Sequence, residues 1–287
     1  MRERNEYPVG VPCWIDIGQP DPEAAVAFYG GLFGWELEDR MPSGSSGPYF
    51  VASLAGRTVA AIGPAPAGIL GQPAWLTYVA VDDADAIAKR VHDAGGRALK
   101  EPFDVGPPGR MGIFADPSGA VFAVWQAGET KGAQLVNEPG TWNFSGVITP
   151  DREGAERFYG AVFGWELSAF DIEDPSAGGY WRLPGYGDFL EQINPGTRSG
   201  MAEMGAPDRF EDTVATFTPP GSGSGDDATP RWDITFGVDD ADATAKRAQD
   251  LGGRVIVPPT DGPWVRMTVL ADPQGAVFAA SKFVPPT

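Results

Sequence analysis

The sequence predicts an α+β protein made of two tandem halves, each containing two β-α-β-β-β units. Three sequence blocks recur in the same order along the 287 residues. The first contains Phe-Tyr-Gly and ends in Phe-Gly-Trp-Glu-Leu, the second begins Val-Asp-Asp-Ala-Asp, and the third reads Asp-Pro-x-Gly-Ala-Val-Phe-Ala. The paired blocks are residues 27–37 and 157–167, 81–86 and 238–243, and 116–123 and 272–279. Ordered double recurrence indicates one module written twice, and we expect domains at 1–130 and 131–287.

The first unit follows from strand, helix and turn signals. Residues 11–17 are apolar and rich in β-branched side chains, which predicts a strand. The Asp-Pro-Glu sequence at 21–23 is typical of a helix start, and apolar residues then recur at helical spacing until Gly34. Gly/Ser/Pro-rich turns separate three further predicted strands, at 35–39, 49–54 and 58–62.

The same order of elements returns in the rest of the chain. After a Pro/Gly-rich connector at 64–73, the second unit is predicted as a strand at 75–81, a helix at 84–94 and strands at 98–103, 111–115 and 121–125. Residues 127–140 are the expected linker. The second half is predicted to contain a helix at 151–162, strands near 165, at 179–183 and at 189–193, a loop at 219–230, a strand at 232–238, a helix at 241–251 and strands at 255–257, 265–270 and 277–281.

The composition excludes several classes of partner. A formal net charge of −18 leaves no basic stripe to neutralise phosphates, so we expect neither nucleic acid nor an anionic membrane surface as a partner. Cys13 is the only cysteine, which rules out a disulfide within the chain. The charged N-terminus is followed by no apolar signal segment, and no apolar run reaches 18 residues. We therefore expect a cytoplasmic protein.

The repeated blocks and the paired units resemble the vicinal oxygen chelate superfamily, which includes glyoxalase I, bleomycin-resistance proteins, fosfomycin-resistance enzymes and extradiol dioxygenases. The resemblance covers nearly the whole chain in two tandem copies. The chain is similar to the tandem actinobacterial type of this superfamily, some members of which are associated with aromatic polyketide pathways. It implies that each half curls its sheet around an open cup, with the helices outside.

The resemblance also implies where a metal would be held. The corresponding positions carry Trp14, Phe144, Ala123, Ala279, Leu76 and Asp233. Divalent metals need several convergent N, O or S donors, so we expect no metal and no other cofactor. If the alignment with the superfamily is shifted by one residue, Asp16 or Glu191 becomes a candidate ligand. A metal site made of carboxylates therefore stays an alternative. His92, the only histidine, lies on a polar helix face and is expected at the surface.

Without a metal, the two cups would be lined by large side chains. The candidates for the first cup are Trp14, Asp16, Trp75, Tyr78, Met111 and Trp125. The candidates for the second are Phe144, Trp181, Trp232, Asp233, Trp264 and Met267. For any single aromatic residue a place in the core fits the sequence equally well. Trp35 and Trp165, inside the repeated block, are expected in the core, and the recurring Arg110 and Arg266 are expected to pair with surface acids.

An aromatic-lined cup suits a flat polycyclic ligand, and Asp16 or Asp233 would pair with an amino group on it. We therefore hypothesise a metal-independent protein that sequesters a planar aromatic natural product, such as a cationic anthracycline antibiotic. It would serve resistance or support a biosynthetic tailoring enzyme, as a monomer or homodimer. The alternative is an enzyme on the same fold, a hydroxylase, lyase or isomerase acting on an aromatic polyketide, with Asp16, Asp233 or Tyr78 in cofactor-free acid–base work. No catalytic residue is assigned. A third hypothesis is a degenerate glyoxalase-like protein with a structural role.

Overall fold

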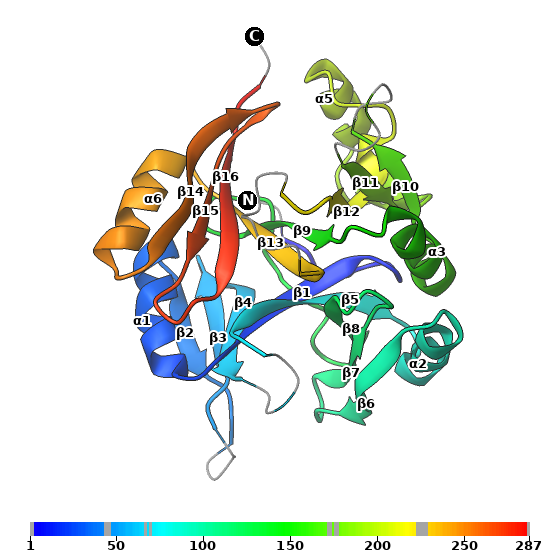
Figure 1. Ribbon diagram of the computed structural model, residues 1–287, viewed down its shortest axis with the longest axis horizontal. Coiled ribbons are helices and arrows are strands. Elements are labelled where there is room, and N and C mark those ends of the chain that lie inside the picture. Colours follow the sequence, from blue (N-terminus) through cyan, green and yellow to red (C-terminus); the bar gives the residue numbers. More distant parts are fainter. Residues whose placement is uncertain are drawn as a thin grey trace.

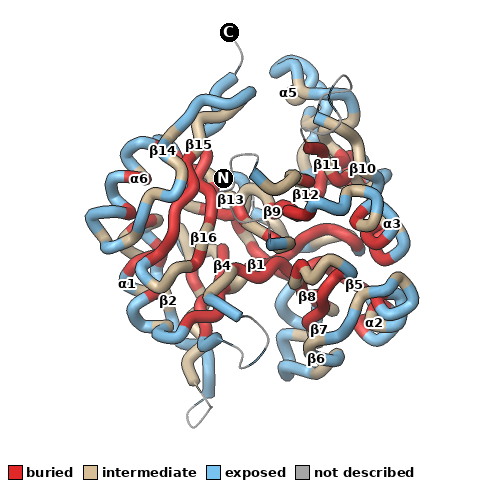
Figure 2. The backbone as a smooth tube through the Cα atoms, viewed as in Figure 1, coloured by how far each residue is buried: buried red, intermediate tan, exposed pale blue. Residues whose placement is uncertain are grey.

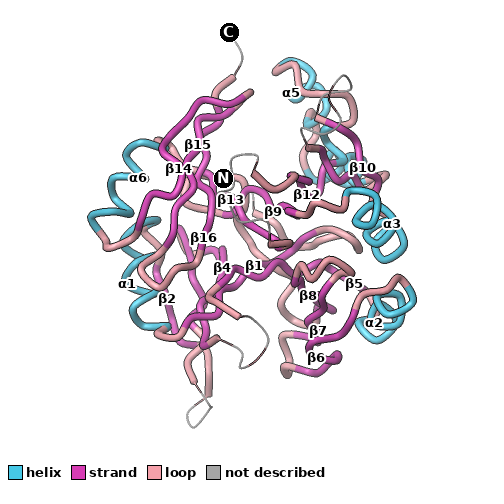
Figure 3. The backbone as a smooth tube through the Cα atoms, viewed as in Figure 1, coloured by secondary structure: helices cyan, strands magenta, loops and turns pink. Residues whose placement is uncertain are grey.

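The computed structural model describes residues 3–42, 47–65, 68, 71–170, 174, 178–221 and 229–285. The loops predicted at 42–48, 64–73 and 219–230 therefore lie partly outside the described residues. The remaining predicted elements can be compared with the structure (Figures 1 and 3).

The first half forms one eight-stranded sheet from two β-α-β-β-β units, in the order β2-β3-β4-β1-β5-β8-β7-β6. Its elements are β1 (Pro12–Gln19), α1 (Pro22–Phe33), β2 (Glu36–Asp39), β3 (Phe50–Leu54), β4 (Arg57–Pro64), β5 (Ala74–Val81), α2 (Ala84–Asp93), β6 (Arg97–Asp104), β7 (Gly109–Ala115) and β8 (Val121–Ala127). β1 lies at the centre of the sheet, parallel to β4 and antiparallel to β5.

The second half repeats this sheet in the order β10-β11-β12-β9-β13-β16-β15-β14. Its elements are β9 (Trp142–Ile148), α3 (Arg152–Phe163), β10 (Glu166–Ala169), β11 (Gly179–Arg182), α4 (Tyr186–Ile193), α5 (Thr197–Glu203), the 3-10 helix η2 (Phe210–Asp212), β12 (Thr213–Thr218), β13 (Arg231–Gly237), α6 (Ala241–Asp250), β14 (Arg254–Gly262), β15 (Val265–Ala271) and β16 (Val277–Phe283). Two curved sheets with helices confirm the predicted α+β fold class.

One predicted strand is wrong. Residues 189–193 belong to helix α4, and the strand at this place in the sheet is β12, which the sequence did not predict. The helix forms because Tyr186, Phe189 and Leu190 lie on one face at helical spacing and pack against the core that contains Trp181. The sequence Thr-Val-Ala-Thr-Phe-Thr of β12 is rich in β-branched residues and supplies the strand instead.

The repeated helix has the ends that the sequence predicts. Asp21 caps α1 by accepting a hydrogen bond from the backbone N–H of Ala24, and Asp151 caps α3 in the same way. Gly34 and Gly164 end these helices with φ angles of 74° and 75°, a left-handed conformation that favours glycine. The helix ends therefore explain why the glycine of Phe-Gly-Trp recurs.

The two sheets pack back to back through their outer faces. Ile15 and Ile17 of β1 share a core with Ile234 and Phe236 of β13. At the centre of this contact, Thr77 Oγ1 and Ser145 Oγ are 2.7 Å apart. The helices lie at the two sides, α1 beside α6 and α2 beside α3, and the central strands are buried (Figures 1 and 2). The concave faces of the two sheets consequently point in opposite directions (Figure 1).

The first and third repeated blocks meet each other across the boundary between the halves. The Tyr29 hydroxyl on α1 donates to Asp272 Oδ2 at 3.0 Å, and the Tyr159 hydroxyl on α3 donates to Asp116 Oδ2 at 2.9 Å. Both aspartates also accept backbone N–H groups of their own Asp-Pro-x-Gly turn through Oδ1. Each half therefore supplies the acceptor that the other half's tyrosine needs.

The two contacts differ in one respect, which gives a prediction. Asp272 Oδ2 also accepts a hydrogen bond from the buried Gln19 at 2.5 Å, whereas Tyr159 is the only described side chain that donates to Asp116 Oδ2. Tyr159→Phe should therefore lower the free energy of unfolding by about 2–3 kcal/mol, as expected for a lost hydrogen bond to a buried charged group. Tyr29→Phe should cost roughly 1 kcal/mol less, because Gln19 still satisfies the oxygen. Urea unfolding of both variants tests this, and equal losses would contradict the assignment.

Candidate functional site

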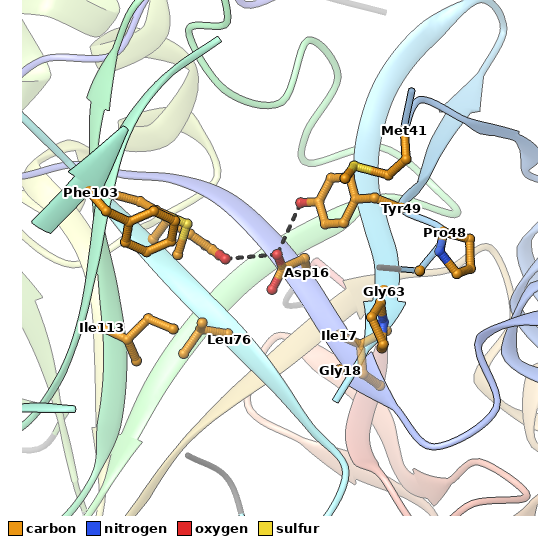
Figure 4. Close-up of a pocket in the computed structure, with 14 residues that line it drawn as sticks. Asp16, Ile17, Gly18, Met41, Pro48, Tyr49, Gly63, Leu76, Phe103 and Ile113 are labelled. Carbon is orange, nitrogen blue, oxygen red and sulfur yellow. Dashed lines mark hydrogen bonds between the residues drawn. The ribbon is translucent and has the colours of Figure 1, made fainter. Parts of the chain in front are cut away.

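The concave face of the first sheet holds a cavity of about 270 Å³ at its floor (Figure 4). Its walls are largely apolar and come from strands on both sides of β1. The lining residues are Asp16, Ile17, Gly18, Met41, Gly47, Pro48, Tyr49, Gly63, Pro64, Leu76, Tyr78, Phe103, Met111 and Ile113. Met41 is an exposed residue, so the cavity reaches the surface. Its size is near the lower end of small-molecule pockets.

Asp16 is the one carboxylate in this cavity, and it is held from one side only. The hydroxyls of Tyr49 and Tyr78 both donate to Oδ2, at 3.0 and 2.7 Å. Trp14 Nε1 in turn donates to the Tyr49 hydroxyl at 3.3 Å. Among the described residues no group donates a hydrogen bond to Oδ1 of Asp16. One oxygen of this carboxylate is therefore available to a ligand (Figure 4).

The surroundings of Asp16 shift its titration. Burial raises the pKa of this carboxyl to about 6, against the lowering effect of the Tyr78 and Tyr49 hydrogen bonds. Burial and the neighbouring carboxylate raise the pKa of both tyrosines well above the ordinary value. At neutral pH the site consequently combines an ionised carboxylate with two protonated hydroxyls that donate to it.

The raised pKa of Asp16 predicts that the free energy of unfolding depends on pH. The folded state binds the Asp16 proton more tightly than the unfolded state, so the contribution to stability is present below about pH 4 and is lost as pH rises to about 6. Asp16→Asn removes this loss. The variant should match the wild-type protein near pH 4 and exceed its free energy of unfolding by about 1–3 kcal/mol at pH 7. Urea unfolding across this range measures the difference, and a difference independent of pH would contradict the assignment.

The structure brings together only part of the predicted first-cup set. Asp16, Tyr78 and Met111 line the cavity. Trp14 and Trp125 pack with Tyr78 on the same face of the sheet, and Trp125 Nε1 donates to the Thr130 carbonyl at 2.8 Å.

Trp75 is a correction to the predicted set. It lies in the core on the opposite face, where its Nε1 donates to the Tyr29 hydroxyl at 3.2 Å. It does not line the cup because successive side chains of a strand point to opposite faces, and Leu76 and Tyr78 take the cup face of β5.

Sequence reasoning missed Tyr49, Phe103 and Met41. Tyr49 directly precedes β3, two residues before Val51, which packs on the cup-side cluster. This period of two was a usable signal for Tyr49. Phe103 pairs in register with Met111 across the β6–β7 hairpin, so its place follows from a predicted neighbour. Met41 follows the end of β2, and no sequence pattern indicated that it would reach the cavity.

Asp233 of β13 lies over the central strand on the concave face of the second sheet. Burial raises the pKa of this carboxyl to about 6, and the charge of Arg231 opposes the shift. A Cβ placed on Gly146 of β9 would lie 2.6 Å from Asp233 Oδ1, so the carboxylate lies over this glycine. Phe144 lies two residues before Gly146 on β9, at the place that Trp14 has on β1.

Trp264 and Met267 lie on the hairpin of β14 and β15. Trp264 is half-buried at the hairpin tip, and its ring stacks on Phe283 with centroids 6.3 Å apart. Met267 pairs with Ser281 as Met111 pairs with Trp125 in the first domain.

Trp181 and Trp232 are also corrections. Both lie in the core on the outer face of the second sheet, packed around Tyr159, and Trp232 Nε1 donates to the Tyr159 hydroxyl at 2.9 Å. Trp35 and Trp165 are buried as expected, with indoles donating to the carbonyls of Gly140 and Gly10.

The residues at the implied metal positions do not fit a metal ion. These positions lie side by side across neighbouring strands, since Trp14 and Ala123 flank Tyr78, and Phe144 and Ala279 flank Thr235. Their side chains offer no set of N, O or S donors for a divalent ion. In the part of the chain that the structure describes, no group of three or more His, Cys, Asp or Glu residues is placed to hold a metal.

The remaining polar motifs lie outside the cups. Arg110 pairs with Asp85 and Asp104 at 2.9 and 3.1 Å, and Arg266 pairs with Asp242 and Asp261. These are the surface ion pairs that the sequence predicts. The side chain of His92 is 86% exposed, and Cys13 is buried. Among the described helices, none has the length and apolar character needed to cross a membrane.

Family models match both halves of the chain. The model described as "Glyoxalase/Bleomycin resistance protein/Dioxygenase superfamily" matches residues 14–124, and the model described as "Glyoxalase-like domain" matches residues 143–281. "Putative glyoxylase CFP32" of Mycobacterium bovis is 40% identical over 288 residues, 99% of each chain. "Anthracycline biosynthesis protein DnrV" of Streptomyces peucetius is 36% identical over 284 residues, 94% of this chain and 92% of the relative.

Solved structures share the fold at low identity. The Mn(II)-bound glyoxalase from Novosphingobium aromaticivorans matches with a TM-score of 0.59 and 17% identity, covering 96% of this chain and 82% of that one. The 2,3-dioxygenase LapB from Pseudomonas sp. KL28 matches with a TM-score of 0.59 and 13% identity, covering 97% and 95%. These likenesses concern the fold alone.

Proposed function

Because the chain belongs to the glyoxalase/bleomycin resistance protein/dioxygenase superfamily, we propose that it uses the cup of that fold to bind a planar aromatic natural product without a metal. The ligand class is an anthracycline-like polyketide that bears an amine. Binding would sequester the ligand, either for resistance or in support of a biosynthetic tailoring enzyme.

One observation carries this proposal: Asp16 presents a free oxygen inside an otherwise apolar cavity. Phe103 and Ile113 on one wall face Met41 and Tyr49 on the other, which suits the two faces of a flat ring system (Figure 4). A protonated amine at the edge of the ring system would pair with Oδ1 and offset the cost of burying the carboxylate. The part of the ligand that exceeds the cavity would extend past the exposed Met41 into solvent.

Relatives support the ligand class. Two curated relatives, from Streptomyces peucetius and Streptomyces sp. (strain C5), are named anthracycline biosynthesis proteins and are 36% identical to this chain. These names associate the two relatives with the synthesis of anthracyclines, which are flat, aromatic polyketides. The chemistry of the first cup, with apolar walls and one carboxylate, matches an anthracycline that carries an aminosugar.

An enzyme on the same scaffold is the second candidate, and the titration of Asp16 favours it. A carboxyl whose pKa is about 6 exchanges protons readily near neutral pH, and the Tyr49 and Tyr78 hydroxyls that donate to Oδ2 would hold it in one orientation. Such a base suits proton transfer next to a carbonyl, as in an isomerase or lyase. In this candidate Asp16 would be the base, and no metal would be required.

Tryptophan fluorescence titrated with daunorubicin, an anthracycline with an aminosugar, tests binding, and chromatography of the same mixtures tests turnover. We expect saturable quenching and unchanged ligand from the wild-type protein. Conversion of the ligand by chelator-treated protein that is lost in Asp16→Asn would favour the enzyme instead. Asp93→Asn, which changes an exposed carboxylate on α2, is the matched control. If daunorubicin causes no quenching and is not converted, both candidates are contradicted.

A further inference from the structure

A carboxylate lies over the central strand on the concave face of each sheet, but the two carboxylates come from different strands. In the first domain Asp16 of β1 pairs in register with Leu76 of β5. In the second domain the matching pair is Gly146 of β9 and Asp233 of β13. The charged residue has therefore moved from one member of the pair to the other.

Both carboxylates nevertheless reach the same place relative to the sheet. Gly146 has the place of Asp16, and a Cβ there would collide with Asp233 Oδ1 at 2.6 Å and with Thr216 Oγ1 at 2.6 Å. The Asp233 carboxylate thus fills the space in which a side chain at position 146 would begin. The absence of a side chain at Gly146 is what allows Asp233 to lie over the central strand.

The fold itself requires neither carboxylate. The counterpart of Asp16 is a glycine and the counterpart of Asp233 is a leucine, so the same backbone accepts an uncharged residue at either position. Removing a carboxylate from water costs free energy unless a partner compensates for it. We propose that the second cup is a separate binding site, centred on Asp233, that takes the protonated amine of an aromatic ligand. The class of ligand rests on the function proposed above, whereas the location of the site does not.

The surroundings of Asp233 explain why this site would select an amine. Asp16 has hydrogen bonds from Tyr49 and Tyr78, but the counterpart of Tyr78 in the second domain is Thr235. Within the described part of the chain, no side chain donates a hydrogen bond to Asp233. A ligand ammonium would supply the hydrogen-bond donors that no described side chain supplies, and its charge would add to that of Arg231, two residues earlier on the same strand. The first cup can retain a ring system without an amine, whereas the second cup depends on it.

The rim of the second cup carries backbone strain of the kind found at ligand sites. Trp264, at the tip of the β14–β15 hairpin, has a φ angle of 67°, which bulky residues rarely adopt. A Cβ on Gly205, just after α5, would lie 3.4 Å from the Trp264 ring. Residues 183–212 join β11 to β12 and reach Trp264 at Gly205, whereas the matching strands of the first domain are joined by Ala55 and Gly56 alone. Trp264 is positioned to pack on a ligand in this cup.

Binding stoichiometry tests the second site. Isothermal titration of the full chain with daunorubicin should give two ligands per chain, and Asp233→Asn should reduce this to one. The aglycone, which has the same rings without the aminosugar, should bind once to the wild-type protein and once to Asp233→Asn. Asp250→Asn on α6, an exposed change of the same kind, should leave two sites.

The possible failures are distinguishable. One daunorubicin per chain in both the wild-type protein and Asp233→Asn would overturn the second site and leave the proposed function intact. Two aglycone molecules per wild-type chain would overturn the requirement for an amine. No binding of either compound would overturn the proposed function together with the second site. Ligand at the second site should quench the fluorescence of Trp264. If Asp233→Asn and Trp264→Phe remove the same part of the quenching, the lost site lies in the second cup.

Discussion

Replacing Asp16 with asparagine is expected to weaken binding of an amine-bearing anthracycline in the first cup by about 30-fold or more. Loss of one partner from a buried, hydrogen-bonded charge pair costs about 2–5 kcal/mol, and 1.4 kcal/mol is a factor of ten. Asparagine keeps an oxygen for the Tyr49 and Tyr78 hydroxyls, so the cavity should keep its shape. Fluorescence titration in an Asp233→Asn background reports the first cup alone.

The aglycone is the control for this prediction. It has no amine, so Asp16→Asn should change its affinity by less than about threefold. The affinities of the wild-type protein and Asp16→Asn for the amine should also depend differently on pH, because protonation of Asp16 below about pH 6 removes the charge that the amine needs. Wild-type affinity for the amine should fall as pH drops from 7 to 5, whereas that of Asp16→Asn should not. Equal losses for both ligands would mean that Asp16 shapes the cavity and does not pair with the amine.

Trp165→Ala should lower the free energy of unfolding by about 4 kcal/mol or more, since truncating a buried tryptophan alone costs about 3–5 kcal/mol. Trp165 is 2% exposed, packs against Tyr159 and Trp232, and donates a hydrogen bond to the Gly10 carbonyl at 2.8 Å. The change therefore leaves both a cavity and a buried carbonyl without a donor. Urea unfolding followed by circular dichroism measures the loss.

The same residue tests whether the two halves unfold together. Trp165 belongs to a core that also contains Val79, Phe114 and Phe122 of the first domain. The unfolding of Trp165→Ala should consequently remain a single transition with a lower midpoint. Trp165→Phe retains ring packing and should lose roughly half as much stability. Two separate transitions in the alanine variant would show that the shared core does not couple the halves.

The fold was predictable because its signals are local and repeated. Asp21 and Asp151 cap helices, and Gly34 and Gly164 end them, so the same pattern occurs twice at the same places. The exception is the region between β11 and β12, where the second half carries α4, α5 and η2 in place of a two-residue turn. An insertion breaks the repeat, and a short apolar run such as 189–193 fits a strand or a helix equally well.

The site was only partly predictable, because the central strands are buried on both faces. Seven of the eight residues of β5 are buried, so apolar character does not alternate along it. Trp75 and Leu76 are adjacent, and only the packing of the second domain against the outer face decides which of them reaches the cup. Trp181 and Trp232 were placed on the wrong face for the same reason. Asp16 was identifiable because a charged residue in such a strand stands out.

The opposed orientation of the two concave faces has a consequence for how the protein would exchange the proposed ligands. Each concave face points to its own side of the molecule, with the back-to-back cores between them (Figures 1 and 2). If both proposed sites bind ligand, a molecule at one concave face would not block access to the other. We therefore expect the two proposed sites to fill and empty independently on a single chain.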